Sequence, residues 1–168
     1  SKGTCPSMNI LENMSIADNK GKKYGLGGGV NKAHMDYYRD QLKILGLGLE
    51  DKMYTQVGSL SGGQRQSLAL LMSTMTPIDF LILDEHTAAL DPKTADIIMK
   101  LTERIVHEKK VTTIMVTHNL RYAVEYGDRL LMMHDGKIIL DQTGEDKKRM
   151  DPDHIMHIFN EISVECGN

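Results

Sequence analysis

The sequence predicts an α/β fold in which a helical subdomain precedes half of a parallel sheet. Residues 1–76 show only helix and loop patterns, whereas a strand, a helix and a second strand follow each other from Ile78 to Thr117. This alternation favours a right-handed parallel crossover. The run Phe80–Asp84 is apolar up to its last residue, which predicts a strand buried on both faces. We therefore expect a helical subdomain in 1–76, half of an α/β core in 77–150, and a C-terminal helix and tail in 151–168.

The composition is that of one globular domain. The chain has 168 residues, of which 40% are hydrophobic and 26% charged, with a formal net charge of −3. This length is enough to bury a core. The net charge gives no global basic signal for nucleic acid, and no apolar run approaches the roughly 20 residues that span a bilayer. Cys5 and Cys166 lie at opposite ends, which fits a reducing compartment and no zinc-site spacing.

Three helices are predicted in the first subdomain. Ser7–Ala17 has apolar residues on one side. Lys32–Leu45 repeats apolar residues at spacings of three and four and is ended by Gly46. The third helix follows Leu60 and runs to about Met75, with Ser61 as a suitable N-cap.

A glycine-rich stretch, Asp18–Gly29, lies between the first two helices and contains several lysines. A phosphate loop requires G-x-x-x-x-G-K-[ST], so that backbone N–H groups surround the phosphates. The pair Gly21-Lys22 has Ile16 in the place of the first glycine and is followed by Lys23. The spacing therefore excludes a phosphate loop here, and we expect a surface loop.

The second half of the chain contains the remaining predicted elements. They are a helix from Asp91-Pro92 to about His107, a strand over Val111–Thr117, a short helix over Asn119–Tyr126, a hairpin turning at Asp135-Gly136, and a last helix opened by Asp151-Pro152 that carries Ile155, Phe159 and Ile162.

Two places in this order are candidates for chemistry. Glycines that follow an N-cap let a ligand approach the free N–H groups of a helix start, so Leu60–Gln64 can form an anion site. Ser-Gly-Gly before a helix is otherwise simply a cap. Asp84 and Glu85 stand at the carboxyl end of a buried strand, where ligands collect in open α/β sheets. The alternative for these acids is a strand that ends in two solvated carboxylates.

Taken together, these segments resemble the ATP-binding subunit of ABC transporters. The family's LSGGQ signature stands at Leu60–Gln64, and its Walker B strand stands at Phe80–Glu85. A D-loop of the family's type is Ala88–Asp91, and the switch histidine after a β-run is His118. Order and spacing match from about Ser7 to Leu140. The resemblance implies a P-loop nucleoside triphosphate hydrolase fold of the ABC ATPase type.

The resemblance also implies catalytic roles. Asp84 would hold Mg²⁺, and Glu85 would act as general base or position the attacking water. His118 would hydrogen-bond the γ-phosphate of ATP. On its own, a histidine in the position of His118 is more often simply a satisfied histidine at a strand end. His86 stands where many family members carry proline, and the resemblance gives it no role.

Further roles concern a second subunit. Ser61, Gly62, Gly63 and Gln64 would face the γ-phosphate of a nucleotide bound by the other member of a head-to-tail dimer. Asp91 would couple the two sites, although its position also makes it an N-cap.

The implied protein couples ATP hydrolysis to solute transport from the cytoplasmic face of the cell membrane, as a peripheral subunit. Its expected partners are a transmembrane permease that contacts the helical subdomain, a second ATPase subunit and a solute-binding protein, but no nucleic acid. The residues after Leu140 and the string Asp84–Thr87 resemble importers of amino acids or similar small solutes.

The chain departs from the family pattern in one respect. The phosphate loop, the adenine-stacking residue and the Q-loop glutamine find no match in these residues. We therefore expect a truncated chain that neither binds nor hydrolyses ATP alone. Two alternatives stay open: a soluble ABC-type ATPase of DNA repair, chromosome maintenance or translation, and an inactive interaction fragment. The first usually adds coiled coils or a second cassette, and neither pattern occurs here.

Overall fold

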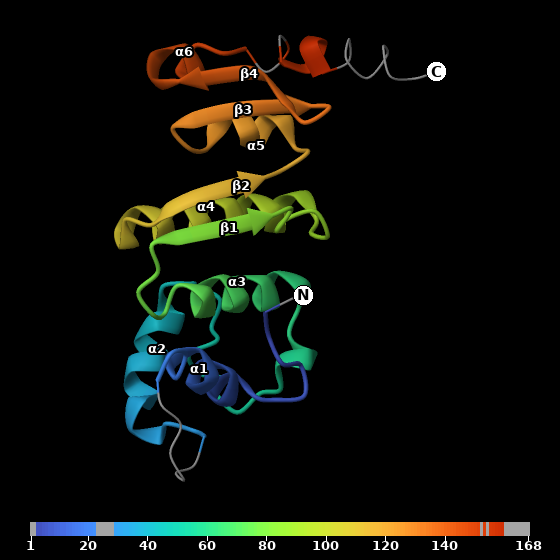
Figure 1. The fold of residues 1–168 in the computed structure, drawn as a ribbon. Coiled ribbons are helices and arrows are strands. Elements are labelled where there is room, and N and C mark those ends of the chain that lie inside the picture. Colours follow the sequence, from blue (N-terminus) through green and yellow to red (C-terminus); the bar gives the residue numbers. More distant parts are fainter. Residues whose placement is uncertain (1–2, 23–28, 152, 154, 160–168) are drawn as a thin grey trace. The chain divides into compact units, whose positions relative to one another are not determined.

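The computed structural model describes residues 3–22, 29–151, 153 and 155–159. The chain divides into two compact units, Ser1–Ile114 and Met115–Asn168. Figure 1 labels the elements. The helices are α1 (Ile10–Asp18), α2 (Met35–Lys43), α3 (Gly62–Ser73), α4 (Pro92–Lys109), α5 (Leu120–Glu125) and α6 (Gly144–Lys148), with short 3₁₀ turns at Lys32–His34 and Val57–Ser59. The strands are β1 (Phe80–Asp84), β2 (Thr112–Val116), β3 (Arg129–His134) and β4 (Lys137–Thr143). Among the described residues, no helix combines the length and hydropathy needed to cross a membrane.

Helices α1, α2 and α3 pack against one another and form the helical part of the first unit. Their shared core consists of fully or almost fully buried side chains from each helix: Ile10, Leu11, Met14, Tyr38, Leu42, Leu68 and Leu71. The segment between α2 and α3 adds Leu49, Met53 and Val57 to this core.

The first helix begins later than predicted, at Ile10 instead of Ser7. Asn9 explains the difference because it forms a capping box with Glu12. The Glu12 N–H donates to Asn9 Oδ1 at 2.9 Å, and the Asn9 N–H donates to Glu12 Oε2 at 2.8 Å. Two of the orphan N–H groups of the helix start are thereby satisfied, which places the helix start at this asparagine.

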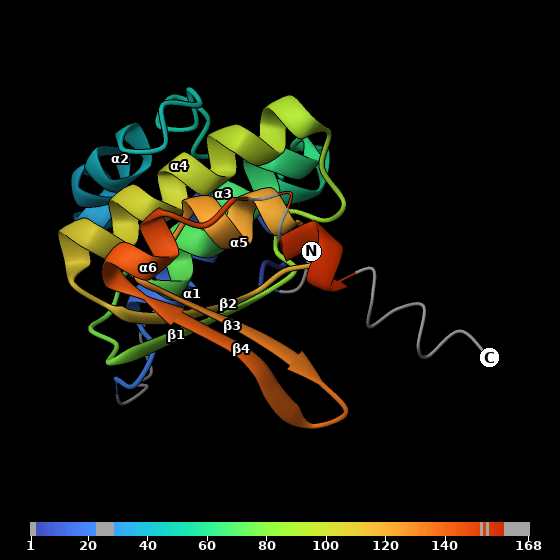
Figure 2. The ribbon, with the colours of Figure 1, turned by 90° about the horizontal axis from the view of Figure 1, so that it is seen from above.

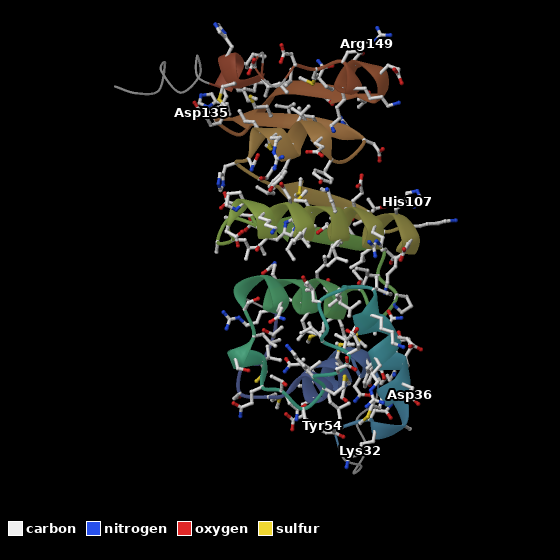
Figure 3. The ribbon with its side chains drawn as sticks, turned by 180° about the vertical axis from the view of Figure 1, so that it is seen from behind. Lys32, Asp36, Tyr54, His107, Asp135 and Arg149 are labelled. Carbon is white, nitrogen blue, oxygen red and sulfur yellow. The ribbon has the colours of Figure 1, made fainter. Side chains whose placement is uncertain are left out.

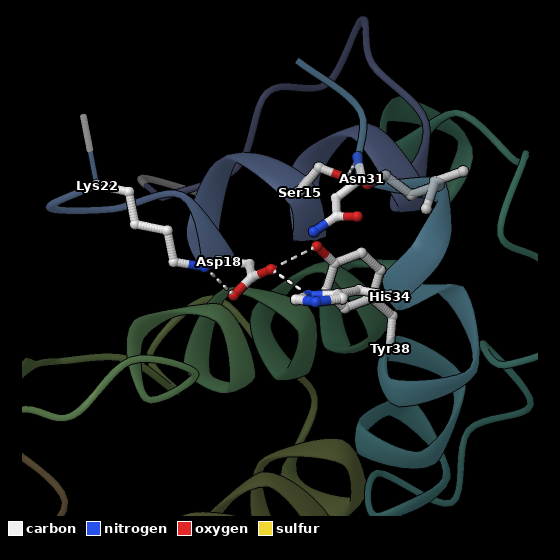
Figure 4. Close-up of polar contacts among 7 residues, drawn as sticks. Ser15, Asp18, Lys22, Asn31, His34 and Tyr38 are labelled. Atoms are coloured by element: carbon white, nitrogen blue, oxygen red, sulfur yellow. Dashed lines mark hydrogen bonds and ion pairs between the residues drawn. The ribbon is translucent and has the colours of Figure 1, made fainter. Parts of the chain in front are cut away.

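A polar cluster at the end of α1 connects it to α2 (Figure 4). Asp18 Oδ2 accepts from the Tyr38 hydroxyl at 2.9 Å and lies 2.7 Å from His34 Nδ1, while Oδ1 accepts from Lys22 Nζ at 3.0 Å. Burial raises the pKa of Asp18, but the hydrogen bonds from Lys22, His34 and Tyr38 outweigh it, and the net shift is downward. Burial, followed by the hydrogen bond to Asp18, raises the pKa of Tyr38 to about 12.

Strands β1 and β2 pair in a two-stranded sheet, and their arrows point the same way in Figure 1. Helix α4 connects them and lies over one face of β1 (Figure 2). The predicted strand–helix–strand unit is therefore present. The prediction that the first strand is buried on both faces is wrong. Leu81 and Leu83 are buried, but Phe80 and Ile82 are 46% and 65% exposed. Among the described residues, only one side of β1 has a covering layer.

The second unit contains an antiparallel hairpin of β3 and β4. Its turn is the predicted Asp135-Gly136, whose φ angles of 47° and 72° lie in the left-handed region that a tight two-residue hairpin turn requires. Figure 3 shows Asp135 at this turn. Helix α6, which the sequence patterns did not predict, packs on both strands.

Lys147 of α6 is 4% exposed, and its ammonium group closes the end of α5. Its Nζ donates to the carbonyl oxygens of Val124 at 2.6 Å, Tyr126 at 2.8 Å and Gly127 at 2.8 Å. These hydrogen bonds use all three donors of the lysine. Lys147 therefore fixes the C-terminal end of α5 to α6.

Two predicted features fall partly outside the described residues. Most of the glycine cluster at 25–29 is outside, as are Pro152 and Ile162 of the last predicted helix. Residues 153 and 155–159 of that helix are helical, and Ile155 is fully buried.

Candidate functional site

The signature segment Leu60–Gln64 forms the start of α3. Ser61 is the N-cap predicted from the sequence, and it forms a capping box with Gln64. The Gln64 N–H donates to Ser61 Oγ at 3.2 Å, and the Ser61 N–H donates to Gln64 Oε1 at 3.1 Å. Ser61 and Gly62 are exposed. The first N–H groups of a helix have no partner within the helix, so this start presents donors and a positive dipole end to solvent.

The two glycines of the signature have different surroundings. A Cβ at Gly62 would lie 3.5 Å from Leu90 Cδ2, an ordinary contact. A Cβ at Gly63 would lie only 2.4 Å from Thr94 Cγ2, which is too close for any real side chain. Gly63 is therefore required by the packing of α3 on α4, whereas the backbone at Gly62 stays open to a ligand.

This packing places the signature segment directly against the D-loop type segment Ala88–Asp91. Leu90 belongs to that segment, and Thr94 lies in the first turn of α4. The two helix starts thus lie side by side in the first unit, a contact that the sequence patterns did not predict. Thr94 has no motif of its own, and only its position three residues after an N-cap could have drawn attention to it.

The carboxylates Asp84 and Glu85 lie at the carboxyl end of β1, as predicted, and both residues are exposed. Glu85 has a φ of 44°, a left-handed conformation that residues other than glycine rarely adopt. The Ala88 N–H donates to the Glu85 carbonyl oxygen at 3.0 Å, so the chain turns immediately after the glutamate. Strained residues of this kind gather at functional sites.

His86 follows Glu85 and points its ring toward α4. Its Nε2 lies 3.2 Å from Oγ1 of Thr102, which is 5% exposed. Burial lowers the pKa of the His86 imidazole. The family resemblance gave this residue no role, but the structure shows that it connects the end of β1 to the middle of α4.

Asp91 is the N-cap of α4, as its position before Pro92 predicted. Its Oδ1 accepts from the Thr94 N–H at 3.0 Å. Hydrogen bonds from the Thr94 side chain and backbone lower the pKa of this carboxyl. Asp91 is exposed, so its capping role leaves the side chain accessible from solvent.

His118 lies in the second unit, two residues after the end of β2. It is exposed. The neighbouring Asn119 caps α5, with its side chain accepting from the Tyr122 N–H at 3.3 Å, and its own N–H donates to Thr117 Oγ1 at 3.0 Å. Hydrogen bonds of its two neighbours, Thr117 and Asn119, therefore hold the backbone on both sides of His118. The other candidate residues all belong to the first unit.

The residues present fit a nucleotide and its metal in part. Within the described ranges, no group of three or more side chains could hold a metal ion. Mg²⁺ in nucleotide sites binds one or two carboxylates and completes its coordination shell with phosphate oxygens and water. One exposed carboxylate, that of Asp84, is therefore enough for this role. The start of α3 suits a phosphate, because Gly62 leaves the backbone accessible.

Comparisons with known proteins agree with these motifs. A family model described as "ABC transporter" matches residues 3–88. The "Tyrosine transport ATP-binding protein" of Clostridioides difficile (strain R20291) is 47% identical over 163 residues, which cover 95% of this chain and 63% of that protein. The chain thus spans less than two thirds of the length of this relative.

Two solved structures have the same fold. The ADP conformation of an ATP-binding cassette of an ABC transporter superimposes with a TM-score of 0.70 at 24% identity, over 95% of this chain and 63% of that one. A dimeric, post-hydrolysis ATP-binding cassette bound to ADP and Pi superimposes with a TM-score of 0.65 at 26% identity, over 83% of this chain and 58% of that one. The predicted fold class is confirmed. The signature segment, the Walker B strand and the family match agree with one another. This chain belongs to the ABC transporter family, in its ATP-binding component.

Proposed function

We propose that this chain is part of an ATPase subunit that drives solute transport. The observation that carries the proposal is the first unit itself, in which the start of α3 lies against the segment leading from Asp84-Glu85 to Asp91. A helix start that suits a phosphate and a pair of exposed carboxylates thus belong to one packed unit. Phosphoryl transfer needs mainly positioning and charge stabilisation, and these groups supply both.

Each residue has a defined task in this proposal. Asp84 would hold Mg²⁺ through its carboxylate, and the bound ion would neutralise charge on the phosphate oxygens. Glu85 would accept the proton of the attacking water, or orient that water. His118 would donate a hydrogen bond to the γ-phosphate.

The remaining candidate residues act across a dimer in this proposal. Ser61, Gly62, Gly63 and Gln64 would face a nucleotide held mainly by a second subunit, and Asp91 would couple the two sites. The dimeric cassette bound to ADP and Pi, to which this chain is similar, supports a paired arrangement.

The transported solute is proposed to be an amino acid or a similar small molecule. The support is the 47% identical relative, whose name assigns it to tyrosine transport. By the same resemblance, the helical part with α1–α3 would contact a permease at the cytoplasmic face of the membrane, and a solute-binding protein would deliver the solute.

We further propose that these 168 residues alone do not bind Mg-ATP tightly. They contain no G-x-x-x-x-G-K-[ST] pattern, and this pattern supplies most phosphate contacts in such folds. Isothermal titration of the chain with Mg-ATP tests this statement. Micromolar affinity would contradict it.

The ATPase proposal is tested with a hybrid protein. This chain replaces the matching segment of the C. difficile tyrosine transport ATP-binding protein, and ATP hydrolysis is measured. We expect Glu85→Gln to lower kcat by at least about 10²-fold, the typical contribution of a general base, with ATP binding retained. The matched control is Glu103→Gln, an exposed glutamate on α4, which should keep full activity. Two results would contradict the proposal. One is full hydrolysis by the Glu85→Gln hybrid, and the other is an unsubstituted hybrid that folds and binds ATP but does not hydrolyse it.

A further inference from the structure

His86 makes a contact that follows from neither the family motifs nor the proposed chemistry. It lies between Glu85 and Thr87, and its half-buried ring reaches α4, where Nε2 is 3.2 Å from Thr102 Oγ1. Thr102 is almost fully buried. The contact therefore joins the residue after the catalytic glutamate to the interior face of a long helix.

The direction of this hydrogen bond follows from Thr102. Its hydroxyl donates to the Ile98 carbonyl oxygen at 2.8 Å. A threonine hydroxyl has only one hydrogen, so toward His86 it can act only as an acceptor. The donor must be His86 Nε2–H. The neutral imidazole consequently carries its proton on Nε2, with Nδ1 as the nitrogen that bears the lone pair.

The turn after β1 explains what this bond can achieve. Glu85 is held at a φ of 44°, and its carbonyl oxygen accepts from the Ala88 N–H at 3.0 Å. His86 is the second residue of this turn. A left-handed conformation at a residue with a side chain costs free energy and persists only where surrounding contacts impose it. The bond from His86 to Thr102 is such a contact, because it attaches the turn to α4 at its second residue.

We propose that His86 is a positioning residue, whose Nε2–H bond to Thr102 holds the turn that keeps Glu85 left-handed and directs its carboxylate. This role rests on the proposed function of Glu85 as base or water-positioner. His86 itself contacts neither water nor phosphate in this proposal.

The first test uses the 168-residue chain and nuclear magnetic resonance. Imidazole ¹⁵N shifts should show the proton of His86 on Nε2. Residual dipolar couplings at Glu85, which depend on the orientation of its backbone bonds, should change in His86→Leu and be retained in His86→Gln, because the glutamine amide can donate as Nε2–H does. If His86→Leu does not fold, Thr102→Val removes the same acceptor at nearly the same volume and should change the same couplings. A proton on Nδ1, or unchanged Glu85 couplings in both His86→Leu and Thr102→Val, would overturn the proposal.

The second test measures hydrolysis in the hybrid protein. His86→Leu and Thr102→Val should each lower kcat roughly 10- to 100-fold, as expected for a misplaced catalytic group, with KM for ATP within about twofold. His86→Gln should restore kcat, which a loss of packing alone would not allow. In a Glu85→Gln background, His86→Leu should add no further loss. An active Glu85→Gln hybrid would refute the role of Glu85, whereas an inactive Glu85→Gln with a fully active His86→Leu would refute only the role of His86.

Discussion

Gly63 offers the sharpest test of how the signature segment is built. A Cβ added there would lie 2.4 Å from Thr94 Cγ2, whereas carbon atoms in contact prefer about 3.5–4.0 Å. The Thr94 side chain also hydrogen-bonds to Asp91, so a rotation that moves the methyl group away would cost this bond. Overpacking of this kind costs about 1–3 kcal/mol. Alanine recovers up to about 1 kcal/mol of helix propensity. We expect Gly63→Ala to destabilise the chain by about 1–2 kcal/mol.

A double-mutant cycle isolates the contact. Thr94→Ser removes Cγ2 but keeps the hydroxyl beside Asp91. In that background only the gain in helix propensity remains, so Gly63→Ala should cost less than about 0.5 kcal/mol or stabilise the chain slightly. The propensity gain cancels in the cycle, so the coupling energy should equal the overpacking cost of about 1–3 kcal/mol, close to the range found for residues in contact. Gly62→Ala is the matched control, because its Cβ would meet only Leu90 Cδ2 at 3.5 Å. This variant should stay within about 0.5 kcal/mol of the parent chain.

Urea unfolding followed by circular dichroism provides the measurement. The midpoint should fall for Gly63→Ala at an unchanged slope, since the substitution changes stability and not the surface exposed on unfolding. An equal loss in the parent chain and in the Thr94→Ser background would show that the threonine methyl group is not the obstacle. The close approach of α3 and α4 would then not be the reason for the glycine.

Three further results are expected. Lys147→Met should lower the free energy of unfolding by about 2–3 kcal/mol in the urea assay, because three carbonyl groups lose a charged donor. The control is Lys148→Met, which replaces an exposed lysine and should cost less than about 0.5 kcal/mol. The folded-state pKa of Asp18 lies below its unfolded value of about 4, so its carboxylate stabilises the fold above that pH, and this stability is lost as pH falls through the folded pKa. In Asp18→Asn, the free energy of unfolding should therefore decrease less between pH 7 and pH 2 than in the parent chain. The exposed apolar face of β1 should cause self-association, and Ile82→Lys should reduce the sedimentation coefficient at high protein concentration. If the parent chain and the Ile82→Lys variant both sediment as monomers, this prediction is contradicted.

Features decided by neighbouring residues could be predicted from the sequence. Ser61 and Asp91 cap the helices that follow them, and Asp135-Gly136 turns the hairpin, because caps and tight turns depend on a few adjacent side chains. Even here a competing local signal shifted one boundary. Apolar spacing alone began the first helix at Ser7, whereas the capping box of Asn9 begins it at Ile10.

Features decided by distant residues could not be predicted. The apolar run of β1 correctly predicted a strand, but burial depends on what covers each face, and Ile82 is 65% exposed. A lysine in a short charged segment has the pattern of a surface residue, yet Lys147 is buried because carbonyl groups at the end of another helix receive its donors. His86 likewise has no signal in its own neighbourhood, since Thr102 is 16 residues away.

The signature glycines show why this difference matters for function. In the sequence they are equivalent, and both suggest a backbone that a ligand approaches closely. In the structure, Gly62 is exposed and leaves room for a side chain, whereas Gly63 is buried against Thr94. A loss of hydrolysis in Gly63→Ala would therefore combine disturbed packing with disturbed phosphate binding. Gly62→Ala leaves the helix contact intact, so a loss of hydrolysis in that variant can be assigned to the approach of the ligand alone.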